Sequence, residues 1–246
     1  MPDKELSLIE HLDELRSRII YCLIPFVIAV LCSTPFVKAF LAFLRIPAEG
    51  VIKELAFFSP EEVAFVYMKI ALFSGFILSL PVILYQIWVF ISPAIAQRQK
   101  KYIVSFIFWA FFAFLCGCAF GYLLLVPFSL KFLIGLAGKE LTPVIALNKY
   151  IGFVLALIAG CGIAFELPVV VWLLARLGIV NSAFLRKKRR YAIAIIFIAA
   201  AVITPTTDPV NMTLMALPML VLYELSIWIA RWNQRGMTTE KVADCH

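Results

Sequence analysis

Charged side chains are scarce in this sequence: of its 246 residues, 15% are Asp, Glu, Lys or Arg, and only two are histidine. Hydrophobic residues make up 63%, whereas soluble domains average about 45–50% on a similar count. The mean hydropathy is +0.99, and no polar stretch is long enough to form a separate soluble domain. This composition excludes an ordinary water-soluble protein and predicts a single transmembrane domain, residues 1–246.

Catalytic and metal-binding patterns are missing as well. The sequence has no GxxxxGK[ST] loop for a nucleotide, no HExxH zinc pair and no G-x-S-x-G nucleophile turn. His11 and His246 lie near opposite ends of the chain, and the six cysteines have no metal or disulfide spacing. We therefore expect no enzyme, no cofactor and no metal site. The net charge of +7 fits the positive-inside rule, so we expect no nucleic-acid partner either.

Six apolar runs are present instead. A membrane-spanning helix needs about 20 apolar residues. Thr204-Pro205 shortens the fifth run to about 21 Å, less than the roughly 30 Å of the hydrocarbon core. The sequence therefore predicts an all-α integral membrane protein with spans at residues 19–36, 70–92, 102–127, 150–176, 190–204 and 210–230.

The distribution of cations predicts the orientation of these spans. With six spans both termini lie on one side, and that side holds 15 of the Lys and Arg residues against 7 on the other. The positive-inside rule then places both termini in the cytoplasm. The first 18 residues contain five acids and no apolar core, so we expect no cleavable signal peptide.

Local patterns predict helix starts and close packing. Ser7 with Glu10, and Ser59 with Pro60 and Glu62, are typical of helix N-termini. Residues 117–121 fit GxxxG, and Ala156 with Gly160 has the same spacing. The loop of residues 37–58 is long and apolar enough to fold over the spans as a cap.

Two carboxylates lie inside the predicted spans. Glu166 is the only charge in residues 151–175, and Glu224 lies in the last span. A carboxylate at the centre of a bilayer-length helix costs about 2.5–3.5 kcal/mol on insertion scales, so it is read first as functional. The structural alternative is that each is satisfied by the other or by the backbone. Glu224 and Arg231 are seven residues apart and are candidates to share a helix face.

The N-terminal segment carries an acidic cluster on the cation-rich side. Glu10, Asp13 and Glu14 precede Arg16 and Arg18. In the structural reading, Glu14 pairs with Arg18 at i,i+4. In the functional reading the carboxylates bind a basic peptide, because they accept guanidinium groups in bidentate fashion. The loops of residues 92–101 and 185–190 are read first as topogenic, and the cations of the second also attract anionic lipid headgroups.

Several motifs in order along the chain carry a family resemblance. Residues 11–18 (HLDELRSR) resemble the N-terminal signature of TatC, the multi-span subunit of the twin-arginine protein translocase. Residues 79–86 and 92–94 resemble its second span and first inner loop, and residues 165–168 (FELP) resemble its fourth-span element. Residues 185–191, and Thr204-Pro205 with Asp208, match its second inner loop and the turn before its last span.

This resemblance implies a six-helix cupped bundle that acts as receptor for twin-arginine signal peptides and as core of a proton-motive-force-driven translocase for folded proteins. The implied location is the bacterial inner membrane. The implied partners are single-span subunits of the TatA/TatB type and membrane lipid, and self-association stays open. The candidate signal-binding residues are Glu14, Glu10, Asp13, Arg16 and Gln99, the intramembrane ones are Glu166 and Glu224, and the others are Pro47 and Asp208.

One position departs from the family. Gln99 stands where family members usually carry Glu, and an amide accepts a hydrogen bond from a guanidinium without contributing charge. Binding is therefore expected to depend more on the N-terminal acids than on this loop. Two rival functions remain: a small proton-coupled secondary transporter with Glu166 as its proton site, and a non-transporting membrane anchor. An inverted repeat, or helices interrupted at matching places, would favour the transporter, and the sequence shows neither feature.

Overall fold

The computed structural model describes residues 8–49, 52, 55–91, 103–136, 144–176, 179–204 and 208–243, with the backbone alone at 8–12, 91, 103 and 233–243. The chain forms two compact units. The described residues of the first come from Met1–Leu41 and Tyr67–Phe111, and those of the second from Ala42–Val66 and Phe112–His246.

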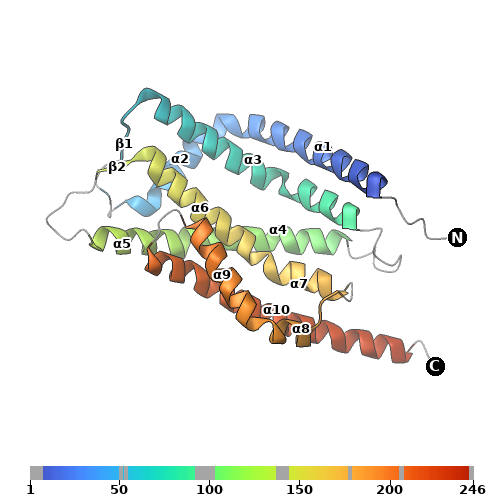
Figure 1. Cartoon of the computed structure of the whole chain (residues 1–246). Coiled ribbons are helices and arrows are strands. Elements are labelled where there is room, and N and C mark those ends of the chain that lie inside the picture. Colours follow the sequence, from blue (N-terminus) through green and yellow to red (C-terminus); the bar gives the residue numbers. More distant parts are fainter. Residues whose placement is uncertain are drawn as a thin grey trace. The chain divides into compact units, whose positions relative to one another are not determined.

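In the first unit, two long helices, α1 (Leu8–Ser33) and α3 (Pro60–Ile91), lie side by side (Figure 1). Small residues allow this close packing: a Cβ on Gly75 of α3 would collide with the backbone of Val30 in α1. The Ser33 hydroxyl donates to the Ala71 carbonyl at 3.1 Å. The unit also includes η1 (Thr34–Phe36) and the first parts of α2 (Val37–Arg45) and α4 (Ile103–Phe120).

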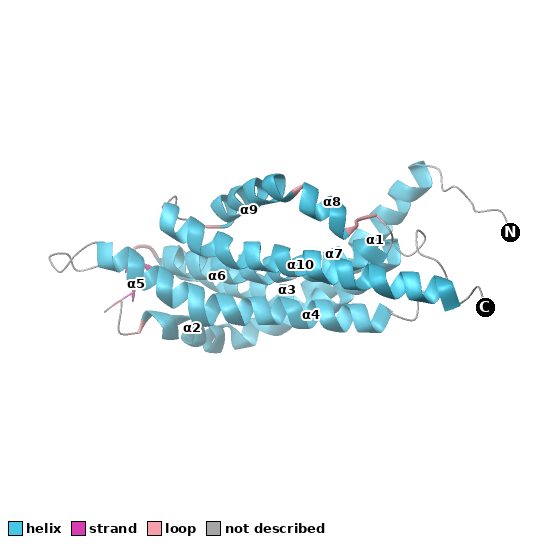
Figure 2. Ribbon diagram, turned by 90° about the horizontal axis from the view of Figure 1, so that it is seen from below, coloured by secondary structure: helices cyan, strands magenta, loops and turns pink. Residues whose placement is uncertain are grey.

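The second unit holds the rest of the described chain, and nearly all of it is helical (Figure 2). Two strands, β1 and β2, form a parallel pair that joins Leu55 to Ile145. In chain order, the elements that begin in this unit and are not yet placed, with the bounds of both strands, are η2 (Ile46–Ala48), β1 (Leu55–Ala56), the π-helical turn η5 (Gly121–Leu125), α5 (Val126–Leu136), β2 (Ile145–Ala146), α6 (Leu147–Phe165), α7 (Leu167–Arg176), α8 (Ser182–Lys187), α9 (Arg189–Ile203) and α10 (Pro209–Ala243).

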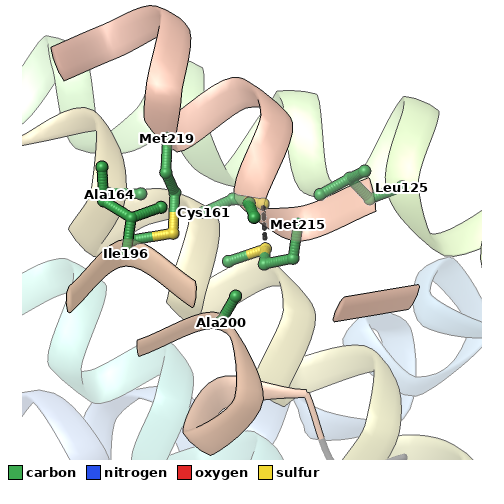
Figure 3. Packing of buried hydrophobic residues seen from close by; sticks show 8 residues of the cluster. Leu125, Cys161, Ala164, Ile196, Ala200, Met215 and Met219 are labelled. Carbon is green, nitrogen blue, oxygen red and sulfur yellow. Dashed lines mark hydrogen bonds between the residues drawn. The ribbon is translucent and has the colours of Figure 1, made fainter. Parts of the chain in front are cut away.

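The core of the second unit lies where α6, α9 and α10 meet, and Figure 3 shows it. Cys161 donates to the Met215 sulfur at 3.7 Å among small and apolar side chains. Gly117 and Gly121 both face Cys161 of α6, and a Cβ on Gly117 would collide with the backbone there. The GxxxG prediction is therefore confirmed as a close helix contact.

Five described helices are long and apolar enough to cross a membrane: Asp13–Ala48, Pro60–Phe90, Val104–Leu136, Leu147–Arg176 and Pro209–Trp232. The fifth predicted span forms as α9, whose 15 residues are fewer than a full crossing needs. Helix α3 begins at Pro60, well before residue 70, where the predicted second span starts, because the Ser59 and Pro60 pattern starts the helix ahead of the apolar run. The strand pair is a departure from the all-α expectation.

Candidate functional site

The first candidate site lies near the start of α1, where Arg18 has two acceptors. Its Nη2 donates to Glu14 Oε1 at 3.2 Å, and its Nη1 donates to Gln86 Oε1 of α3 at 3.2 Å. The side chains of Arg18 and Glu14 are 27% and 24% exposed. The predicted i,i+4 pair is therefore formed, and it is extended to a second helix by a residue that sequence reasoning missed.

The other candidate residues of the signal site have exposed side chains or lie, in whole or in part, outside the described residues. Asp13 and Arg16 lie on α1 with exposed side chains. The Glu10 backbone is part of α1, but its side chain is outside the described residues, and so is all of Gln99. Of the predicted signal-binding residues, the structure therefore gives only Glu14 a defined polar environment.

The second candidate site is Glu166, which lies at a break in the fourth predicted span. Helix α6 ends at Phe165 and α7 begins at Leu167, so the span is not one uninterrupted helix. The physical reason is Pro168, which has no N–H to donate to the carbonyl four residues earlier. The Glu166 N–H instead donates to Ile163 at 3.1 Å. The Pro168 signal was present in the sequence and predicts this break.

The Glu166 residue is half-buried, and its two carboxylate oxygens differ. Its Oε1 atom is buried and makes no hydrogen bond with any described residue. Buried polar groups are normally paired, and an unpaired one costs free energy. This oxygen therefore takes no part in either pairing that the structural reading offered, with Glu224 or with the backbone, within the described residues.

Glu224 differs from Glu166 because it has a partner. Its Oε2 accepts from Arg189 Nη2 at 2.7 Å, and the two side chains are 54% and 49% exposed. This partner lies at the start of α9 and was not among those considered from the sequence, which noted only that Glu224 and Arg231 could share a helix face. This ion pair favours the structural reading of Glu224.

Pro47 and Asp208 each lie at a helix end. Pro47 is in η2, directly after α2. The last carbonyls of α2 accept tyrosine hydroxyls: Tyr122 donates to Phe43 at 2.7 Å, and Tyr150 donates to Leu44 at 2.8 Å. Asp208 Oδ2 accepts the Asn211 N–H at 2.8 Å, so it caps the start of α10.

Glu62 holds two distant segments together. Its carboxylate accepts the Phe58 N–H at 2.9 Å and the Asn148 N–H at 3.1 Å. The Glu62 N–H donates to the Ser59 carbonyl, and α3 begins at Pro60 as predicted. Sequence reasoning identified the helix start but not the contact with α6. The contacts of Tyr122 and Tyr150 with α2 were also missed, although a tyrosine hydroxyl within an apolar span signals that an acceptor lies nearby.

The carboxylate and amide oxygens of these sites can bind cations and accept hydrogen bonds. Within the described ranges, no group of three or more His, Cys, Asp or Glu side chains is placed to hold a metal ion. Glu14 and Gln86 offer acceptors of the kind that guanidinium groups use. Glu166 offers a buried carboxylate to a polar group that enters from elsewhere.

Comparisons with known proteins agree with these features. The family model described as "Sec-independent protein translocase protein (TatC)" matches residues 10–218. The TatC protein of Aquifex aeolicus is 39% identical over 237 residues, which cover 94% of this chain and 97% of that protein. The TatC protein of Carboxydothermus hydrogenoformans is 38% identical over 232 residues, with 94% and 96% covered.

A solved structure is similar as well. The crystal structure of "Twin Arginine Translocase Receptor- TatC" has a TM-score of 0.83 and 38% identity, and the match covers 92% of this chain and all of that one. These comparisons give the secondary transporter no support. The chain is a multi-pass membrane protein of a protein-transport system and is not an enzyme. On sequence and on fold alike, this chain belongs to the TatC family of Sec-independent protein translocase proteins.

Proposed function

We propose that this chain is the receptor for twin-arginine signal peptides and the core subunit of a translocase for folded proteins. The observation that carries the proposal is the likeness, at 38% identity and a TM-score of 0.83, to a structure named as a twin-arginine translocase receptor. The Glu14 carboxylate supports it, since it already accepts a guanidinium from Arg18. Glu10, Asp13, Arg16 and Gln99 are the further residues proposed to contact the signal.

The proposed arrangement is one transmembrane domain, residues 1–246, with six spans in a cupped bundle. Five long apolar helices supply five spans, and the 15-residue α9 supplies the sixth where the bilayer thins or neighbouring helices shelter it. The division of Lys and Arg, 15 against 7, supports cytoplasmic termini in a bacterial inner membrane.

Glu166 is proposed to serve a partner or a watery cavity within the membrane. Its Oε1 is buried and makes no hydrogen bond with any described residue, so a polar side chain of a single-span TatA/TatB-type subunit is a fitting partner. Export driven by the proton-motive force is part of the same proposal. Pro47 and Asp208, at helix ends, are proposed to maintain the shape of the segments between spans.

The decisive test is binding of a signal peptide to the purified chain in detergent or nanodiscs. A twin-arginine peptide is expected to bind, and a twin-lysine peptide of the same sequence is expected to bind much more weakly, because an ammonium does not make the bidentate contact. Equal binding of both peptides, or of neither, contradicts the proposal.

The variant Glu14→Gln tests whether Glu14 contacts the signal peptide. This change removes the negative charge and keeps the shape, so we expect the peptide to lose about 1.5–3 kcal/mol of binding free energy, the scale of a hydrogen bond to a charged group. The measurement is a titration followed by anisotropy at matched protein levels. Wild-type affinity in Glu14→Gln places the site elsewhere.

A further inference from the structure

The starting point is the two-acceptor contact made by Arg18. One guanidinium spans Glu14 Oε1 on its own helix and Gln86 Oε1 on α3, with both donor–acceptor distances at 3.2 Å. The two acceptors lie 72 positions apart in the sequence, at Glu14 and Gln86. The first unit therefore contains a pair of oxygens spaced to receive the two terminal nitrogens of one arginine.

A guanidinium fits this pair and an ammonium does not. Arginine has a rigid, planar fork of N–H donors, so its two terminal nitrogens can each reach a different acceptor. Lysine has one nitrogen and acts as a point charge. A site with a carboxylate and an amide oxygen at this spacing therefore discriminates between the two cations by geometry, and not by charge alone.

We propose that Glu14 and Gln86 together form the arginine-selective part of the signal-peptide site, and that Arg18 occupies it in the free protein. A signal arginine then takes the place of Arg18 on these two oxygens. This inference rests on the proposed receptor function. It adds Gln86 as a specificity-determining residue and Arg18 as an internal competitor.

The exposure of the pair is consistent with such an exchange. Arg18 and Glu14 keep 27% and 24% of their side-chain surface exposed, so the carboxylate can be approached without opening the core. Arg18 is held by one ion pair and one hydrogen bond to an amide. A signal arginine offers the same two donors, so it can compete with Arg18 for the same two oxygens.

Four variants test the exchange by titration with twin-arginine and twin-lysine peptides. Arg18→Gln and Arg18→Lys both abolish the two-point contact, so twin-arginine affinity is expected to rise by about two- to five-fold, the range that a partly exposed pair represents. Arg231→Gln, which removes a cation on α10, is the control for a general charge effect. Gln86→Leu is expected to lower the ratio of twin-arginine to twin-lysine affinity by about ten-fold or more, the scale of one hydrogen bond to a charged group.

Each outcome has a definite meaning. Unchanged or lower twin-arginine affinity in Arg18→Lys overturns the competitor, as does an equal gain in Arg231→Gln. An unchanged affinity ratio in a folded Gln86→Leu overturns the specificity role. If the Arg18 and Gln86 variants give these contrary results while Glu14→Gln still loses binding, the receptor function stands without this inference. If Glu14→Gln also binds normally, the site lies elsewhere. The receptor function itself fails only if the wild type binds both peptides equally or binds neither.

Discussion

Glu166 shows what a single residue requires from its surroundings. A carboxylate facing lipid is costly, and the described protein offers its buried Oε1 no hydrogen-bond donor. A carboxylate that faces lipid and a buried oxygen without a donor would each lower the stability of the folded protein. Both observations agree with the proposed role, in which water or a polar group of a partner helix meets this carboxylate.

Removing this carboxylate separates function from stability. We expect Glu166→Ala to insert and fold at least as well as wild type, because an unpaired buried group is lost, and to support less export. Glu166→Gln should keep part of the activity if hydrogen bonding is what matters and little if charge or protonation is. Membrane level, signal-peptide binding and export are measured together.

Two results contradict this account of Glu166. Normal export by Glu166→Ala removes the functional claim. A fall in protein level, with the remaining protein fully active, assigns the residue a structural role. Glu224→Gln is the informative comparison, since Glu224 already has Arg189 as partner and its loss is expected to affect the α9–α10 contact first.

At the scale of elements, side chains at helix ends join segments that are far apart in the sequence. Tyr122 and Tyr150 donate to the last carbonyls of α2, across 79 and 106 positions. Tyr122 lies in the π-helical turn η5, between α4 and α5. The segment that carries Pro47 is therefore attached to two spans by side-chain hydroxyls.

Glu62 makes the same kind of link, and its neighbour provides a matched control. Glu62→Gln replaces a charged acceptor of two backbone N–H groups with a neutral one, so we expect a lower thermal unfolding midpoint. Glu61→Gln removes the same charge one position earlier, where the side chain is exposed, and should leave the midpoint nearly unchanged. Equal effects of the two changes would show that only charge at the helix start matters.

For the whole molecule, the cation distribution predicts which parts of the chain face each side of the membrane. Cys245 and residues 186–190, which the sequence suggested as a loop and the structure places at the junction of α8 and α9, are expected to be cytoplasmic. Glu61, Lys139 and Asp208 are expected to be outside. In spheroplasts, a membrane-impermeant thiol reagent should therefore label wild type no more than Cys245→Ser. It should label Glu61→Cys strongly.

Permeabilised membranes provide the control for the topology, because Cys245 should then react and raise labelling above that of Cys245→Ser. Labelling of Cys245 in sealed spheroplasts reverses the whole arrangement. It also removes the signal site from the compartment where unexported substrates are found, so the receptor proposal depends on this result.

The sequence by itself determined the class of protein, five of the membrane helices as long apolar elements, the helix start at Pro60 and the Glu14–Arg18 pair. All of these are local: hydropathy, capping and i,i+4 contacts depend on residues a few positions apart. The family motifs added the transport system, since they recur in order along the chain. Even the break at Glu166 was encoded locally, by Pro168.

Only the tertiary structure decided which distant residues meet. Gln86 joins Arg18 across 68 positions, and Arg189 pairs with Glu224 across 35 positions. The strands β1 and β2 pair across 90 positions, from Leu55 to Ile145. Such contacts depend on how helices cross, and the crossing is set by small residues such as Gly75 and Gly117 that allow backbones to approach. A one-dimensional pattern carries no information about which partner a side chain meets across a helix interface.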